Sequence, residues 1–385
     1  MGRRRKEAQT NYLWKLNKTV YGLADANRNW YLKLKDELIN LNGKPVKLDA
    51  SIFTWFNKDD KLIGVMSCFV DDVLWGGSPE FKETIVLLKK RFKIGSEHSQ
   101  SFSYIGSDLY QNEEFEITVN QNDYASNLTL IDMENINASQ KQRTLTDVER
   151  KTLRSALGQL NWLACMSRPE ISFSISQLSS KVKTATVAEL IETNKIIKFV
   201  KSTPSTIKIP KLDLTTTKVA AFSDASFNNL ENGGSQGGHV VFLCDNKGAC
   251  MPVAWSSNKV KRVVRSTLAA ETLALTEGAD TAFFVAALFK EVYTNNKGDN
   301  AMVNCFTDSR SLFEVTGTSN LVSDKRLRVE VAAIREMIDK GEITINWVGK
   351  ESQLSDSLTK KGASASLLLK VLKEGNFSQI SRFSN

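Results

Sequence analysis

Apolar and polar positions along the chain predict a helix and then a hairpin in the N-terminal part. Trp30, Leu34, Leu38 and Leu41 recur at helical spacing, Asp25 can cap this helix, and Gly43 and Pro45 end it. Two strand-like runs follow, 62–70 and 73–77, and Asp71 and Asp72 separate them. This pattern predicts a hairpin. The two aspartates are either polar turn residues or part of a metal-binding turn.

Residues 80–215 predict a helix-rich region. Apolar residues recur at helical spacing in three places: Phe81 to Phe92, Leu153 to Ala164 and Ile196 to Val200. The residues themselves indicate no chemistry here. The Ser/Thr-rich stretches 202–206 and 214–217 predict a linker to the last third of the chain.

The C-terminal third predicts a mixed α/β domain. Its elements follow the order strand, strand, strand, helix, strand, helix, helix, strand, helix. The predicted strands are 218–224, 238–244, 251–256, 301–307 and 342–348.

Four acidic residues lie where these elements could aim them at one another: Asp224, Glu271, Asp308 and Asp356. Each has a structural alternative. Asp224 could start a turn, Asp308 could cap a helix, and Asp356 could be an ordinary first-turn acid. Glu271 has small or apolar neighbours, and an unpartnered carboxylate on such a helix is costly to bury. Four converging carboxylates suit divalent cations in phosphodiester chemistry.

Composition narrows the choice of chemistry. The 385-residue chain is long enough for two or three domains, and its net charge of +8 favours a polyanionic partner such as nucleic acid. The five cysteines form no CxxC pair, which predicts reduced thiols inside a cell. With two histidines, His98 and His239, neither a histidine-built zinc site nor a Ser-His-Asp triad is favoured. No apolar run is expected to span a membrane. The basic residues 3–6 could be a nuclear address or a phosphate contact.

Several motifs together resemble the copia-type retrotransposon reverse transcriptases. Residues 16–23 with 28–31 resemble a block of that family, and Phe69-Val70-Asp71-Asp72 resembles its Tyr-Val-Asp-Asp box. Residues 89–94 and 104–106 fit the segment that follows, and Arg168-Pro169-Glu170-Ile171 resembles a later Arg-Pro-Asp-Ile motif. The resemblance runs from about residue 14 to about residue 362.

The resemblance implies an α/β and α+β multidomain chain. Its parts would be a partial reverse-transcriptase palm (1–98), a helical thumb and connection (99–215), a ribonuclease H-like domain with a mixed five-stranded sheet (216–362) and a C-terminal tail (363–385). The palm of this family needs another aspartate upstream of residue 16, and the chain is expected to start too late to contain it. Residues 24–28 also depart from the family's Lys-Gln-Ala-Pro-Arg. Asp71 and Asp72 then supply one side of a metal clamp, so we expect little or no polymerisation by this chain alone.

For the C-terminal domain, the resemblance implies hydrolysis of the RNA strand of RNA–DNA hybrids. Its metal ligands fall on Asp224, Glu271, Asp308 and Asp356, with two Mg²⁺ ions, or Mn²⁺ instead. No histidine lies near the last aspartate, and Lys325-Arg326 stands where relatives often carry Lys-His. The expected phosphate contacts precede the Glu271 helix: Lys259, Lys261, Arg262 and Arg265. Other expected donors to the substrate are Ser226, Gln236 and Asn258.

The expected partners are the RNA–DNA hybrid, an RNA template, DNA and other Pol-derived chains, with no membrane. The expected setting is intracellular, in cytoplasmic particles or the nucleus. Two alternatives remain open. The chain could be a non-catalytic nucleic-acid-binding remnant of a transposon, or a component of a larger polymerase.

Overall fold

The computed structural model describes residues 19–20, 22–134, 138–231, 233–298, 301–318, 322 and 324–378. They form two compact units, Met1–Ser96 with Val292–Asn295, and Glu97–Glu291 with Asn296–Asn385. Half of the predicted block at 16–23 (residues 16–18 and 21) and the basic cluster at 3–6 lie outside the described residues.

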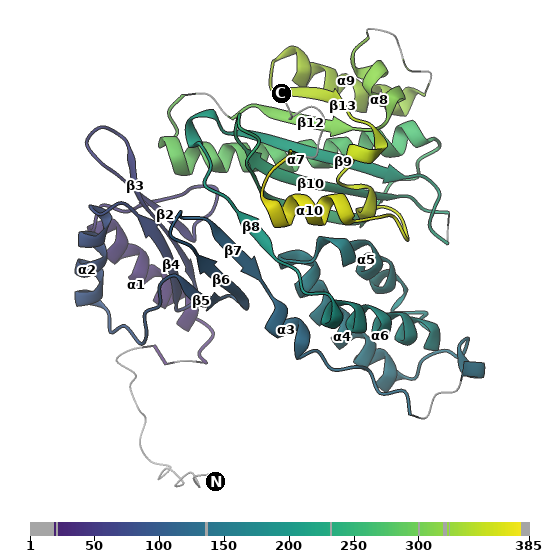
Figure 1. Ribbon diagram of the computed structural model, residues 1–385, viewed down its shortest axis with the longest axis horizontal. Helices are drawn as coiled ribbons and strands as arrows, with labels where there is room; N and C mark the ends of the chain where they lie inside the picture. Colours follow the sequence, from purple (N-terminus) through teal and green to yellow (C-terminus); the bar gives the residue numbers. More distant parts are fainter. Residues whose placement is uncertain are drawn as a thin grey trace. The chain divides into compact units, whose positions relative to one another are not determined.

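The first unit is an antiparallel sheet in the order β1-β2-β3-β4 with two helices (Figure 1). The elements are α1 (Ala26–Asn40), β1 (Lys44–Pro45), β2 (Ile52–Phe56), β3 (Leu62–Phe69), β4 (Asp72–Gly77) and α2 (Phe81–Arg91). The predicted helix and hairpin are both confirmed. Asp25 does not cap α1 with its side chain, since its carboxylate accepts a hydrogen bond from the Asn29 amide at 2.9 Å instead.

The second unit begins with a small sheet and a group of helices. The elements are β5 (Ser101–Tyr104), β6 (Ser107–Gln111), β7 (Ile117–Asn120), α3 (Asn122–Ser126), η1 (Ala138–Gln140), α4 (Asp147–Met166), η2 (Pro169–Ile171), α5 (Ser172–Lys181), α6 (Val187–Ser202), β8 (Ile207–Ile209) and η3 (Leu214–Thr216). The helices α4 and α6 confirm two predicted helices. The region was expected to be helix-rich, and the sheet, in the order β5-β6-β7-β8, was not predicted.

The rest of the second unit is built on a five-stranded sheet in the order β11-β10-β9-β12-β13. The pairs β11–β10 and β10–β9 are antiparallel, while β9–β12 and β12–β13 are parallel. This order confirms the expected ribonuclease H-like sheet. The elements are β9 (Lys218–Ser226), β10 (Gln236–Cys244), β11 (Cys250–Lys259), α7 (Thr267–Thr294), β12 (Val303–Thr307), α8 (Arg310–Thr316), α9 (Lys325–Asp339), β13 (Ile343–Trp347), η4 (Lys350–Ser352), η5 (Asp356–Leu358) and α10 (Ser366–Glu374).

Helices cover both faces of this sheet, which is why β9 is buried along almost its whole length. Val219 and Ala221 pack with α7 and α9, whereas Ala220 and Phe222 point to the opposite face and pack with α10. Phe377, after α10, lies in the same core. The predicted tail therefore contributes to the core of this domain, because its apolar residues bury one face of the sheet.

The sequence pattern was expected to contain no run that could span a membrane. In the structure, α7 is 28 residues long and apolar enough to do so by length and composition. Its buried residues, among them Leu275, Ala279 and Ala282, pack on the sheet in one hydrophobic cluster. This packing favours a core helix of the domain.

Candidate metal centre

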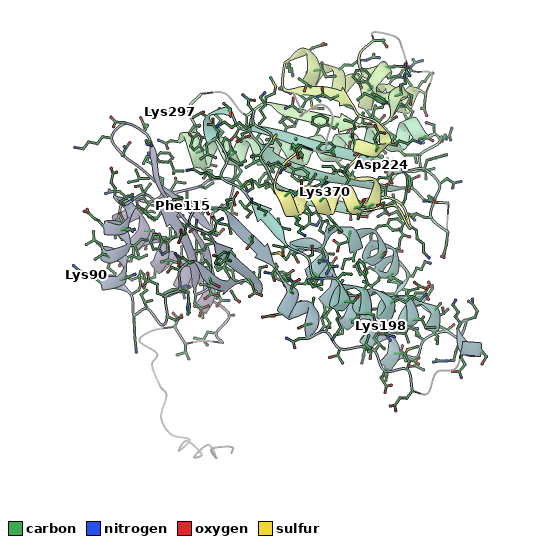
Figure 2. The ribbon with its side chains drawn as sticks, in the orientation of Figure 1. Lys90, Phe115, Lys198, Asp224, Lys297 and Lys370 are labelled. Carbon is green, nitrogen blue, oxygen red and sulfur yellow. The ribbon has the colours of Figure 1, made fainter. Side chains whose placement is uncertain are left out.

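Asp224 lies near the end of β9, the central strand of the five-stranded sheet (Figure 2). It pairs with Gly238 of β10, and only 1% of its surface is exposed. Burial raises the pKa of this carboxyl, and Asp308 and Asp356 raise it further, while Lys360 and a hydrogen bond from Thr359 oppose the shift. The strand thus carries a carboxylate into the interior.

Glu271 lies in the second turn of α7, where Ala270 and Ala274 pack with Ala225 of β9. The residue is 5% exposed. Burial and the charges of Asp224 and Asp308 raise its pKa to about 9. Lys360 and a hydrogen bond with the Ala225 backbone act in the opposite direction without cancelling the shift. Ionisation of this carboxyl therefore costs free energy in the metal-free protein, and a bound cation would offset that cost.

Asp308 directly follows β12 and is half-buried. It does not cap α8, because the N-cap is Ser309, whose hydroxyl accepts a hydrogen bond from the Leu312 N–H at 3.4 Å. The Trp347 indole donates to the Asp308 backbone carbonyl at 3.2 Å. The side chain of Asp308 is left to face the other acids.

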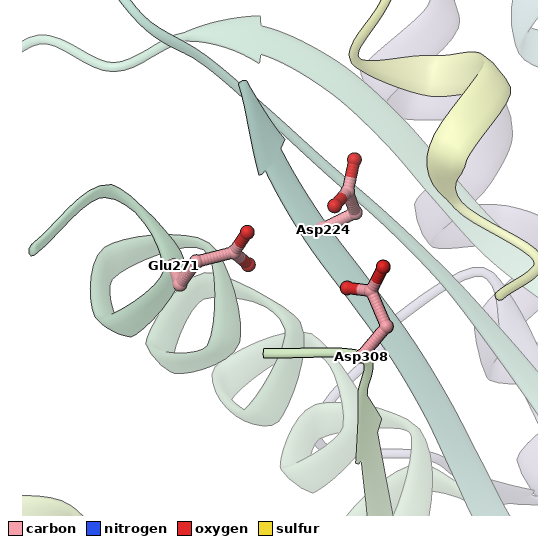
Figure 3. Close-up of side chains that lie close together, drawn as sticks. All are labelled: Asp224, Glu271 and Asp308. Carbon is pink, nitrogen blue, oxygen red and sulfur yellow. The ribbon is translucent and has the colours of Figure 1, made fainter. Parts of the chain in front are cut away.

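The three carboxylates come together at one end of the sheet (Figure 3). One oxygen from each of Asp224, Glu271 and Asp308 lies within 4.8 Å of the others. In an octahedral Mg²⁺ site, oxygens on opposite sides of the ion lie about 4.2 Å apart and neighbouring oxygens about 3 Å apart, so the three carboxylates would have to draw closer to share one ion. An all-oxygen donor set suits Mg²⁺, Mn²⁺ or Ca²⁺ better than the softer transition metals. The chemistry of these residues fits a divalent cation.

Asp356 begins η5, and among the described residues it is not part of this group. Its carboxylate pairs with the Lys360 ammonium, which also lies 3.4 Å from Asp224 Oδ2. The Thr359 hydroxyl donates a hydrogen bond to Asp224. Burial lowers the pKa of Lys360, but the carboxylates of Asp224 and Asp356 outweigh that effect and raise it. Sequence reasoning gave Thr359 and Lys360 no role, although the spacing of Asp356 and Lys360 already suggests an ion pair.

The remaining predicted site residues lie elsewhere. Asp71 and Asp72 are exposed at the β3–β4 turn, and no other group of three metal-binding side chains occurs in the described part of the chain. His239 is buried in β10 against Thr281, and burial lowers its pKa to about 4.

The expected nucleic-acid contacts divide into two sets. Lys259 is exposed at the end of β11, and Lys261, Arg262 and Arg265 are exposed between β11 and α7. Arg262 pairs with Glu330 of α9. Asn258 is exposed as well, and its amide donates to Ser256. Ser226 and Gln236, which were expected to contact substrate, are instead buried and bonded within the protein.

The chain is similar in sequence to a reverse-transcriptase family and to transposon Pol polyproteins. Residues 3–145 match the sequence family described as reverse transcriptase (RNA-dependent DNA polymerase). The Pol polyprotein of the Arabidopsis thaliana transposon RE1 is 26% identical over 91% of the chain, and that of tobacco (Nicotiana tabacum) transposon TNT 1-94 is 23% identical over 90%. The chain spans 24% and 27% of the lengths of these relatives.

Similarity to solved structures is weaker. Ribonuclease H1 from Halobacterium salinarum aligns with 37% of this chain and 94% of its own length, at 20% identity and a TM-score of 0.28. The protease-reverse transcriptase of prototype foamy virus covers 78% of this chain at 12% identity and a TM-score of 0.25, with 43% of its own length aligned. The fold assignment therefore rests on the strand order of the sheet.

Proposed function

We propose that this chain belongs with the copia-like retrotransposon Pol polyproteins and that its five-stranded domain is a divalent-metal-dependent ribonuclease H. The substrate is the RNA strand of an RNA–DNA hybrid. The observation that carries the proposal is the group of three carboxylates, two of them deeply buried, at one end of a mixed five-stranded sheet.

In this proposal, Asp224, Glu271 and Asp308 hold one cation, and Asp356 joins Asp224 in holding a second once Lys360 is displaced. Mg²⁺, with Mn²⁺ as the alternative, would supply an activated water and stabilise the leaving oxygen. The chain's own contribution is to fix three carboxylates in a buried setting, where their charges cannot be satisfied by water. The raised pKa of Glu271 couples its ionisation to the arrival of the cation.

Binding of the hybrid is assigned to the exposed cations before α7. Lys259, Lys261 and Arg265 are available to phosphates, whereas Arg262 must first leave Glu330. The substrate would then be recognised by duplex shape and 2′-hydroxyl contacts.

We propose that this chain does not extend primers by itself. The Asp71–Asp72 turn offers one side of a two-metal clamp, and no third metal-binding side chain joins the pair in the described residues of its unit. Primer extension by the full chain would contradict this proposal. The five unpaired cysteines, four of them buried, fit the proposed intracellular setting, in cytoplasmic particles or the nucleus.

The experiment that tests the nuclease proposal is cleavage of a labelled RNA–DNA hybrid with Mg²⁺. Asp224→Asn removes one ligand charge at nearly constant volume, and we expect a loss of about 100-fold or more. Asp339→Asn makes the same change at an exposed position at the end of α9 and should leave cleavage unchanged. Hybrid binding without cleavage by the folded wild-type chain would favour the non-catalytic remnant.

A further inference from the structure

A directional chain of hydrogen bonds runs from α5 to η5. The Gln177 amide donates to Gln236 Oε1 at 3.1 Å, and Gln236 Nε2 donates to the hydroxyls of Ser176 at 3.1 Å and Ser257 at 3.0 Å. The Ser257 hydroxyl in turn donates to the Leu358 carbonyl at 2.5 Å. Leu358 is the last residue of η5, the short helix that begins at Asp356.

Gln236 is the central residue of this series of hydrogen bonds, and it has no exposed surface. A buried amide is costly unless it is hydrogen-bonded, and here both amide hydrogens and the oxygen have partners. Losing one partner would leave a buried polar group unsatisfied. Gln236 is also the first residue of β10 and pairs with Ser226, two residues beyond Asp224. This series of hydrogen bonds therefore passes beside the metal centre.

The backbone that follows η5 is fixed by the same end of the sheet. The Ser226 hydroxyl donates to the Thr359 carbonyl at 2.8 Å. A Cβ added at Gly238 would lie 2.7 Å from the Leu358 side chain, so the close approach of β10 to this segment requires glycine. The side chains of Thr359 and Lys360 then reach Asp224. Small shifts of η5 would move the groups that contact Asp224.

On its other side, η5 contacts α5 and η2. The Arg-Pro-Glu-Ile motif forms η2, and buried Arg168 pairs with Glu170 and donates to Thr203 Oγ1 at 2.9 Å. These bonds fasten η2 to the end of α6. A second link is the Trp255 indole of β11, which donates to the Ala164 carbonyl of α4 at 2.6 Å. The helices α4 to α6 thus hold in place the surface against which η5 packs.

We propose that Gln236 is a positioning residue, through which α5 sets the place of η5 and so the metal affinity of the nuclease site. The inference rests on the proposed nuclease function for its catalytic consequence. It assigns the helices α4 to α6 an indirect, positioning part in the chemistry of the C-terminal domain, in addition to any contact they make with nucleic acid.

The test uses the full chain and two sets of variants. The double variant Ser176→Ala with Gln177→Ala removes the hydrogen bonds between α5 and Gln236. Gln236→Met removes the central amide of the network and keeps a side chain of similar volume. Thr193→Val is the matched control, because Thr193 is equally buried in α6 and its hydroxyl donates to the Glu189 carbonyl at 2.7 Å, outside this chain. The measurements are Mn²⁺ affinity by titration, and kcat and KM for hybrid cleavage.

We expect the Ser176→Ala/Gln177→Ala double variant and Gln236→Met to bind Mn²⁺ about tenfold more weakly than the wild type. Both should also lose kcat by a similar factor, with KM unchanged. The control should match the wild type. Wild-type Mn²⁺ affinity and kcat in the α5 double variant would overturn the proposal, even if Gln236→Met failed to fold. Equal losses in the control would overturn it too, since they would indicate general destabilisation. If the wild type cleaves no hybrid but the double variant still loses Mn²⁺ affinity, the nuclease proposal fails and the positioning proposal stands.

Discussion

The buried carboxyl of Glu271 predicts that the metal-free protein is destabilised by its own candidate metal centre. Its pKa is raised from the usual 4.5 to about 9 in the folded state, first by burial and then by Asp224 and Asp308. Below pH 4.5 the group is neutral in both states and has no effect. As pH rises towards 9 the unfolded chain releases this proton while the folded chain keeps it, so the free energy of unfolding falls.

The size of the effect follows from the shift. Each pH unit in this window removes up to about 1.4 kcal/mol, which gives an upper bound of about 5 kcal/mol at pH 8. Water penetration and side-chain relaxation reduce this value, and we expect Glu271→Gln to recover about 2 kcal/mol. For a domain of 150–250 residues, this gain raises Tm by about 4–8 °C.

The assay is thermal unfolding of the metal-free chain at pH 5 and pH 8. Glu271→Gln should be more stable than wild type at pH 8, and the difference should shrink at pH 5. Glu277→Gln is the control, because Glu277 is exposed on the same helix and the charge change is identical. A Glu271→Gln chain that is no more stable than wild type at pH 8 would refute the reasoning.

Adding Mg²⁺ should reverse the order at pH 8. A ligand that binds only the folded state stabilises it by about 2.7 kcal/mol at 100 times its Kd. The wild type should gain this stabilisation, while Glu271→Gln should gain much less because it lacks one ligand charge. The same substitution is therefore stabilising without the metal and destabilising with it, which a purely structural role for Glu271 does not predict.

Three other predictions concern the surroundings of the site. Lys360→Met should raise Mn²⁺ affinity in a calorimetric titration, because the ammonium competes with the cation for Asp224, and weaker binding would contradict this. Lys261→Ala combined with Arg265→Ala should weaken hybrid binding and lower the slope of log K against log salt by about 2, measured by fluorescence anisotropy, with kcat unchanged. Asp72→Asn should leave hybrid cleavage at the wild-type rate, and a loss would place the β3–β4 turn in the nuclease reaction.

The C-terminal sheet was predictable because its strands have strong local patterns. β9 is buried on both faces, so it reads as an apolar run that ends at a carboxylate. Glu271 stood out for a related reason, since its small and apolar neighbours indicated a buried helix, and it is 5% exposed in the structure. The positions of Asp224, Glu271 and Asp308 then follow from the order of the elements.

The sheet β5–β8 was not predicted because its strands carry little information. They are three to five residues long, and β7 is half-buried at every position, so no clear alternation marks it. β8 also joins β7 from about 90 positions away in the sequence, a pairing that no local pattern reveals. The surrounding helices have strong periodicity and led to the helical expectation.

Long-range contacts also decide what the polar residues around the metal centre do. The pair Asp356–Lys360 spans four positions and would form in almost any helical turn. By contrast, Thr359 meets Asp224 across 135 positions, and Ser257 meets Leu358 across 101. Ser226 and Gln236 looked like substrate donors in the sequence because their partners are also non-local, 133 positions away for Ser226 and 21 to 60 positions away for Gln236. The ligands on β9, α7 and β12 are therefore placed by their own elements, whereas Asp356 is placed by a segment that other parts of the chain hold in position. The competence of the site should therefore depend on that segment as well as on the three acids that the sequence already reveals.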